Sequence, residues 1–183
     1  MPLTPLHLAY ALPLKLKLRQ LSLAGLLIGS MIPDLDQPIM SLLGQWPNRL
    51  VMHSLAGAFT VNALACFILA WLLAELRLER VGIRCFAGLR FDKIFYVSAV
   101  LGSLTHIAVD SLYHQHNPLL WPLMQNVDSP LYPLIGYRIY MVFDILSLLL
   151  LLLGIRQVLK REGQGLRFLL REPKKALEMI TGM

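Results

Sequence analysis

The chain alternates long apolar runs with short polar segments, which is the pattern of a helical membrane protein. Several runs approach or reach the roughly 20 residues that a helix needs to cross a bilayer. The three clearest are Leu55 to Ala74, Ile94 to Leu112 and Ile139 to Ile155. We expect each of them to form a transmembrane helix.

The sequence before the first of these spans has a different pattern. Thr4 and the proline after it suit the start of a short helix, which we expect to end near Pro13. A segment with alternating basic residues follows, and a second apolar run extends from Leu21 to Ile32. Neither piece is long enough to span a bilayer alone. The pattern therefore predicts a helical hairpin or broken helices, a geometry that membranes tolerate only inside protein or beside a cavity.

The composition agrees with this interpretation. Apolar residues make up 56% of the 183 positions, charged residues only 15%, and the mean hydropathy is +0.60. The predicted fold class is an all-α integral membrane protein, with an N-terminal helical hairpin or broken helices plus about three transmembrane spans in a small bundle. We expect residues 1–159 to form the membrane-embedded domain and residues 160–183 a basic cytoplasmic tail.

Charge gives the orientation. All but two of the 17 lysines and arginines lie in residues 15–19, residues 77–93 or the segment from Arg156 onward. These segments share one side of the membrane if the predicted helices alternate, and the positive-inside rule makes that side cytoplasmic. The same rule accounts for the net charge of +6, so we expect no nucleic-acid partner. The prediction is a multi-pass protein of the inner, cytoplasmic membrane.

The opposite side collects the residues that could carry chemistry. None of the five histidines lies in the basic loops or the tail. The spans were assigned from apolarity alone, so this grouping is an independent observation. Eight candidate metal ligands fall at or near segment ends that point away from the cytoplasm: His7, Asp34, Asp36, His53, His106, Asp110, His114 and His116.

Two local patterns favour a metal site. His106 and Asp110 are four residues apart, so on a helix they share a face and can reach one ion together. Asp34 and Asp36 follow a predicted helix C-terminus, where negative charge is unfavourable and a divalent cation would offset it. The alternatives are a hydrated polar pair at a helix end and a solvated turn whose aspartates bond backbone amides.

Mixed imidazole and carboxylate ligation suits zinc first, with manganese or iron as alternatives. One or two ions are compatible with this number of ligands. Asp144, inside the last span, is a further candidate as a ligand, an orienting partner or a base. Arg49 and Arg138, the basic residues on this side, could bind a phosphate or carboxylate of a substrate, or could extend to the membrane interface.

Five motifs carry a family resemblance when they are read in order: His7, Pro33-Asp34-Leu35-Asp36, His53-Ser54, Gly102-x-x-x-His106-x-x-x-Asp110 and Leu119-Leu120-Trp121-Pro122. Over about residues 3 to 123 the chain resembles the YdjM-like predicted membrane-bound metal-dependent hydrolases of prokaryotes. The resemblance implies a bacterial or archaeal inner-membrane protein with a catalytic metal. The implied ligands are those matching His7, Asp34, Asp36, His53, His106 and Asp110.

The chain departs from that family pattern at one place. Members commonly carry another histidine four or five residues before the one matching His53, where this chain has Asn48 and Arg49. Three explanations remain open at this stage. His114 or His116 replaces the ligand, the metal site is simpler, or the chain has lost activity.

The leading hypothesis is a metal-dependent hydrolase at the outer face of the inner membrane, acting on a lipid or lipid-linked ester, in the first place a phosphoester. A carboxylate such as Asp36 or Asp110 would serve as the base. The alternative is a non-enzymatic metal-binding or transport protein in which His106, Asp110 and Asp144 line an ion path. A third possibility is a scaffold with a degenerate site, which would bind no metal.

Overall fold

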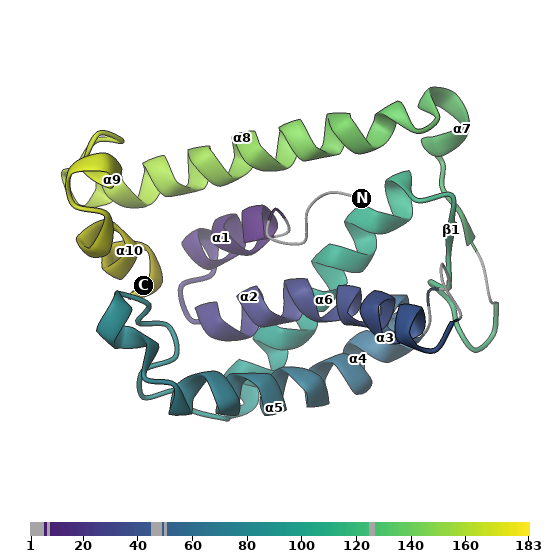
Figure 1. Cartoon of the computed structure of the whole chain (residues 1–183), viewed down its shortest axis with the longest axis horizontal. Helices are drawn as coiled ribbons and strands as arrows, with labels where there is room; N and C mark the ends of the chain where they lie inside the picture. Colours follow the sequence, from purple (N-terminus) through teal and green to yellow (C-terminus); the bar gives the residue numbers. More distant parts are fainter. Residues whose placement is uncertain (1–5, 7, 45–48, 50, 125–126) are drawn as a thin grey trace.

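The structure is a computed structural model that describes the whole chain except residues 1–5, 7, 45–48, 50 and 125–126 (Figure 1). The described part is mostly helical, with a short two-stranded sheet. Its elements, with η for 3-10 helices, are α1 (Leu8–Lys17), α2 (Leu23–Met31), η2 (Ile32–Leu35), α3 (Asp36–Leu42), η3 (Val51–His53), α4 (Leu55–Phe59), α5 (Val61–Glu75), η4 (Leu78–Val81), α6 (Lys93–Tyr113), β1 (His116–Asn117), β2 (Val127–Asp128), α7 (Tyr132–Ile135), α8 (Arg138–Arg161), α9 (Phe168–Arg171) and α10 (Pro173–Thr181).

Within the described residues, α6 and α8 are the two helices that are long and apolar enough to cross a membrane. Their surroundings differ. Half of the most apolar window of α6 is buried inside the protein, but only 17% of that of α8. Along α8, leucines such as Leu149 and Leu153 are more than half exposed, a surface that suits contact with lipid chains rather than water.

Glycines bring α2 and α6 into close contact. A Cβ atom on Gly29 would lie 2.2 Å from the carbonyl oxygen of Ala99, and one on Gly102 would lie 2.4 Å from that of Leu26. Small residues allow such close helix packing where the hydrophobic effect between helices is weak. This contact fixes the end of α2, and the η2 turn that follows it, against the middle of α6.

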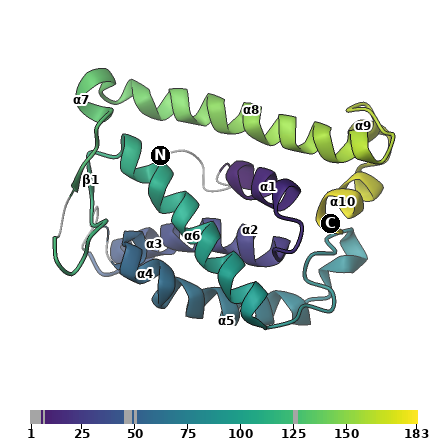
Figure 2. The ribbon, with the colours of Figure 1, turned by 180° about the vertical axis from the view of Figure 1, so that it is seen from behind.

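The prediction that the first helix ends at Pro13 is wrong, because α1 continues through this proline to Lys17. A proline inside a helix removes one backbone hydrogen bond, and its ring crowds the preceding turn. Tertiary packing offsets that cost, since α1 lies between α2 and α8 (Figures 1 and 2). The hydroxyl groups of Tyr10 and Ser147 are 2.6 Å apart across the contact with α8.

The predicted span from Leu55 to Ala74 is not one helix, because it breaks at Thr60 into α4 and α5. The backbone of Thr60 has φ −119° and ψ −89°, outside the helical region. Its amide bonds the Gly57 carbonyl, and its hydroxyl donates to the Ala56 carbonyl at 2.8 Å. A threonine that bonds the backbone in this way competes with the helical hydrogen bonds.

The bundle has two chemically different ends. One end, which we call the metal end, holds η2, η3, the C-terminal part of α6 and the β1–β2 hairpin, in which His116 pairs with Asp128. The other, the basic end, holds the C-terminal ends of α1, α5 and α8 together with α10 (Figures 1 and 2). There α10 packs against the segment after η4, where Arg84 pairs with Glu178 at 2.7 Å.

Candidate metal centre

Four side chains from three elements converge at the metal end. Asp34 comes from η2, His53 ends η3, and His106 and Asp110 lie one turn apart on α6. One potential ligand atom from each of the four lies within 4.8 Å of the ligand atoms of the other three. The structure therefore places in one cluster residues as far apart in the sequence as Asp34 and Asp110.

The spacing of the ligand atoms is that of a small coordination sphere. His106 Nε2 lies 3.3 Å from Asp110 Oδ2 and 3.5 Å from Asp34 Oδ1. His53 Nε2 lies 3.5 Å and 3.7 Å from the same two oxygens. Ligands about 2.0–2.1 Å from a tetrahedral zinc ion are about 3.3 Å from one another, so these distances are compatible with one shared ion.

Both histidines are oriented through their other ring nitrogen. His106 Nδ1 lies 2.8 Å from the Ser30 carbonyl, which can only accept, so this nitrogen carries the hydrogen and Nε2 can ligate. His53 Nδ1 lies 2.8 Å from Asp36 Oδ2. Metal-binding histidines commonly use a carbonyl or carboxylate in this way. Asp36 therefore contacts the cluster as the partner of His53.

The local sequence explains how the η2 turn and the first residue of α3 place two aspartates at the site. Pro33 has no N–H group and cannot continue the hydrogen-bond ladder of α2, so the chain tightens into a 3-10 turn. The turn directs Asp34 to the four-ligand cluster, while Asp36, at the start of α3, reaches the far side of the His53 ring.

Arg49 reaches the cluster from the loop before η3. Its Nη1 lies 2.8 Å from Asp110 Oδ2 and donates to Asn117 Oδ1 at 2.7 Å. Its Nη2 lies 2.8 Å from His114 Nε2, which must be the acceptor because a guanidinium only donates. Burial lowers the pKa of His114 to about 3, so this ring is neutral.

Asp110 has further partners that the sequence analysis did not identify. Its Oδ1 accepts a hydrogen bond from the Tyr113 hydroxyl at 2.5 Å, and Asn117 Nδ2 donates to its backbone carbonyl at 3.0 Å. The three-residue spacing of Asp110 and Tyr113 on one helix was a signal available in the sequence. The contact between His106 and Ser30 has no such signal in the sequence, because it uses only the backbone carbonyl of Ser30.

Other predicted site residues lie elsewhere. His7 and Asn48 are outside the described residues. His116 is exposed and pairs with Asp128 at 2.9 Å on the hairpin, not with the cluster. Asp144, on α8, is outside the four-ligand group, and Arg138 is exposed at the start of the same helix.

The charges of the described residues fit a divalent cation. With neutral imidazoles, the carboxylates of Asp34, Asp36 and Asp110 and the guanidinium of Arg49 give a formal charge of −2. Without a metal the cluster attracts a proton instead. Burial lowers the pKa of His53, but hydrogen bonds to the three carboxylates outweigh burial and raise it to about 10. Two imidazoles and two carboxylates could thus hold a divalent metal ion, and binding would release that proton.

The comparisons with known proteins identify the family. Searches of curated proteins and of solved structures give no match to this chain. A family model described as YdjM inner membrane protein matches residues 3–170, which is most of the chain and includes all four clustered residues. The chain therefore belongs to the YdjM inner membrane protein family.

Proposed function

We propose that this protein is a metal-dependent hydrolase that acts on a lipid or lipid-linked phosphoester at the outer face of the inner membrane. The observation that carries the proposal is the buried cluster of Asp34, His53, His106 and Asp110, with both imidazoles oriented for ligation. A divalent ion bound there would lower the pKa of a coordinated water and polarise the bond to be cleaved.

The side chains around the cluster have distinct roles in this proposal. Asp36 and the Ser30 carbonyl hold the two imidazoles in place. Arg49 and Tyr113 bond the two carboxylate oxygens of Asp110 and favour its ionised form. Asp34 is 9% exposed, whereas the other three clustered residues are 0 or 1% exposed. Asp34 is therefore the carboxylate that a substrate would meet first, and we assign it the role of proton acceptor.

An apolar groove supports a lipid substrate. A cavity of about 510 Å³ begins beside Asp34 and continues between α2 and α5, lined by residues such as Leu27, Met31 and Leu73. At its other end it reaches Phe86, in the segment after η4, and Leu177 of α10. A lipid whose acyl chain lies in this groove would have its polar head near the cluster, whereas a soluble substrate would not need an apolar groove.

The distribution of charge supports the proposed topology. The C-terminal parts of α1 and α8, the segment after α5, and α10 carry most of the basic residues, and these segments lie at the end of the bundle opposite the metal end (Figure 1). By the positive-inside rule the basic end, with the C-terminal segment, faces the cytoplasm, and the metal end faces outward. In this arrangement α4 and α5 together form a third span beside α6 and α8.

The test combines metal content with lipid hydrolysis in detergent-purified protein. We expect one divalent ion per chain in the wild type, its loss in His106→Ala, and its retention in His116→Ala, which removes a histidine outside the cluster. The wild type and His116→Ala should release phosphate from phosphatidic acid or a polyprenyl phosphate, and His106→Ala should not. Equal metal content in the wild type and His106→Ala would overturn the ligand assignment.

One observation favours the transport alternative. Asp144 Oδ1 is buried in α8 and makes no hydrogen bond to any part of the chain that the structure describes. A transporter would carry labelled zinc into proteoliposomes and would hydrolyse neither lipid. Hydrolysis without uptake would support the enzyme, and uptake without hydrolysis would support the alternative.

A further inference from the structure

A pocket distinct from the apolar groove lies at the basic end of the bundle, between the C-terminal ends of α1 and α8. It has a volume of about 430 Å³ and shares no residue with the metal centre. We call it the basic pocket. It is lined by Lys15, Leu16, Arg19, Val158, Arg161, Glu162 and Met183.

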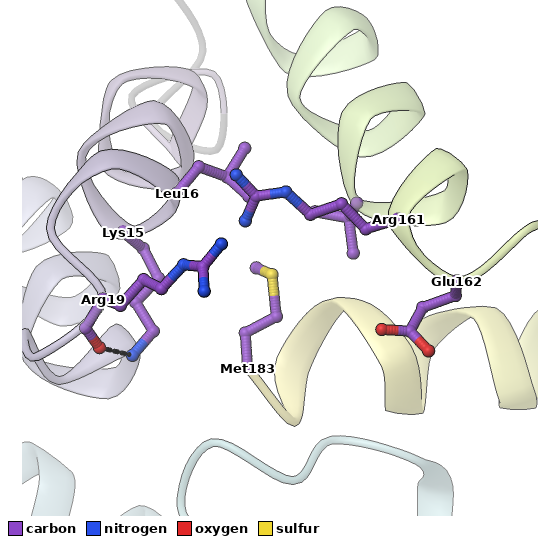
Figure 3. A pocket seen from close by; sticks show the side chains of 7 residues that line it. Lys15, Leu16, Arg19, Arg161, Glu162 and Met183 are labelled. Atoms are coloured by element: carbon purple, nitrogen blue, oxygen red, sulfur yellow. Dashed lines mark hydrogen bonds between the residues drawn. The ribbon is translucent and has the colours of Figure 1, made fainter.

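Two arginines point into this pocket: Arg19, in the turn after α1, and Arg161, the last residue of α8. Figure 3 shows the guanidinium groups of Arg19 and Arg161 directed toward the same space, while the Glu162 carboxylate lies apart from both. Among the described residues, neither guanidinium has an ion pair or a side-chain hydrogen bond, in contrast to Arg84 with Glu178. Like charges repel, so the convergence of two exposed guanidinium groups with no carboxylate between them favours an anion in this space.

The remaining lining residues make the pocket suitable for an amphiphilic anion. Lys15 Nζ donates to the carbonyl of Arg19 at 2.8 Å (Figure 3) and to that of Leu21 at 2.7 Å. Its positive charge lies in the last turn of α1, where a cation is favourable. The buried side chains of Leu16 and Val158 form an apolar floor beside these cations. A free inorganic anion would gain nothing from such a floor.

We propose that the basic pocket binds the phosphate headgroup of an anionic phospholipid. Guanidinium groups match phosphate oxygens in charge and geometry, and the apolar floor suits the glycerol and the first part of an acyl chain. The pocket lies where the apolar helix α8 ends, which is the level of lipid headgroups in a membrane that this helix crosses. The site is independent of the metal centre and of the proposed hydrolysis.

Native mass spectrometry of the full-length, delipidated protein in detergent tests the proposal. Mixed with equal amounts of dioleoyl phosphatidylglycerol and dioleoyl phosphatidylcholine, the wild type should retain one phosphatidylglycerol in preference. In the double variant Arg19→Gln with Arg161→Gln, the ratio of bound phosphatidylglycerol to bound phosphatidylcholine should fall at least about tenfold, because two charge-assisted contacts are removed. The matched control, Arg167→Gln with Arg171→Gln, removes two exposed charges of the tail outside the pocket and should retain it.

Three results would overturn the proposal. In the first, the wild type binds both lipids equally. In the second, both double variants lose the preference to the same extent, which would indicate general surface charge. Binding of inorganic phosphate as tight as that of phosphatidylglycerol would indicate a free-anion site. Metal content should be unaffected in every case, so failure here is distinguishable from failure of the proposed hydrolase. Because Arg19 and Arg161 are exposed, helicity and thermal unfolding of both double variants should match the wild type.

Discussion

Substitution of Gly29 by alanine tests how strictly the metal centre depends on the contact between α2 and α6. The new Cβ atom would lie 2.2 Å from the carbonyl oxygen of Ala99 and 3.0 Å from its carbonyl carbon. Ordinary contacts of a Cβ atom begin near 3.4 Å, so the two helices must separate by about 1.2 Å. Overpacking of this kind typically costs about 1–3 kcal/mol of folding free energy.

The separation acts directly on the metal centre. Ser30 follows Gly29, and its carbonyl is 2.8 Å from His106 Nδ1. A displacement of about 1.2 Å along this bond would stretch it to about 4.0 Å, beyond hydrogen-bond range. Asp34 moves with the same segment relative to His106. Loss of such an orienting bond typically lowers metal affinity about 10- to 100-fold.

Zinc titration of the purified protein by calorimetry measures this effect, with circular dichroism to show that the variant remains helical. Gly165→Ala is the matched control, because its Cβ would meet no atom within 4 Å and should leave zinc affinity unchanged. A helical Gly29→Ala variant that binds zinc with wild-type affinity would refute the reasoning. The close helix contact would then not determine the geometry of the ligands.

Three further predictions concern the surroundings of the ligands and the topology. Asp36→Asn keeps the size of the side chain but weakens the hydrogen bond that orients the His53 imidazole, so zinc affinity should fall about 10- to 100-fold in the same titration. Unchanged zinc affinity would contradict the orienting role of Asp36. Arg49→Gln leaves the buried Asp110 carboxylate without its guanidinium partner and should lower the free energy of unfolding of the metal-free protein by about 3 kcal/mol in denaturant titrations. A decrease of less than about 1 kcal/mol would argue against the ion pair. In a cysteine-free background, an impermeant maleimide should label Gln115→Cys in intact cells and Gln164→Cys only after permeabilisation, and the opposite pattern would reverse the proposed orientation.

Apolar length and helical spacing made part of the fold predictable. The apolar run from Ile94 to Leu112 coincides with α6 almost to the residue, and the start of α8 lies one residue before its prediction. The four-residue spacing of His106 and Asp110 predicted a shared face, and both side chains do reach one cluster. These features are local, because they depend on the pitch of one helix and on the apolar length that a bilayer requires.

Features that depend on tertiary contacts were not predictable in this way. Apolarity is continuous through Thr60, so nothing in the pattern marks the break between α4 and α5. Pro13 normally signals a helix end, but packing of α1 between two other helices overrides it. Asp36 was expected to ligate directly, and its contact with His53 depends on how η3 folds back over the start of α3.

Arg49 is where the structure adds most to the sequence. At a position near which the family resemblance led us to expect a histidine, this chain places a guanidinium 2.8 Å from Asp110 Oδ2 and 2.8 Å from His114 Nε2. The residue thus contributes a positive charge, and it engages the nitrogen with which His114 would otherwise ligate. A charge of −2 remains on the three carboxylates and this guanidinium, which one divalent ion neutralises. A second ion would leave a buried site with an excess of positive charge, a costly arrangement. We therefore expect the proposed hydrolase to use a single ion, and the residue that looked like a lost ligand is consistent with a simpler site.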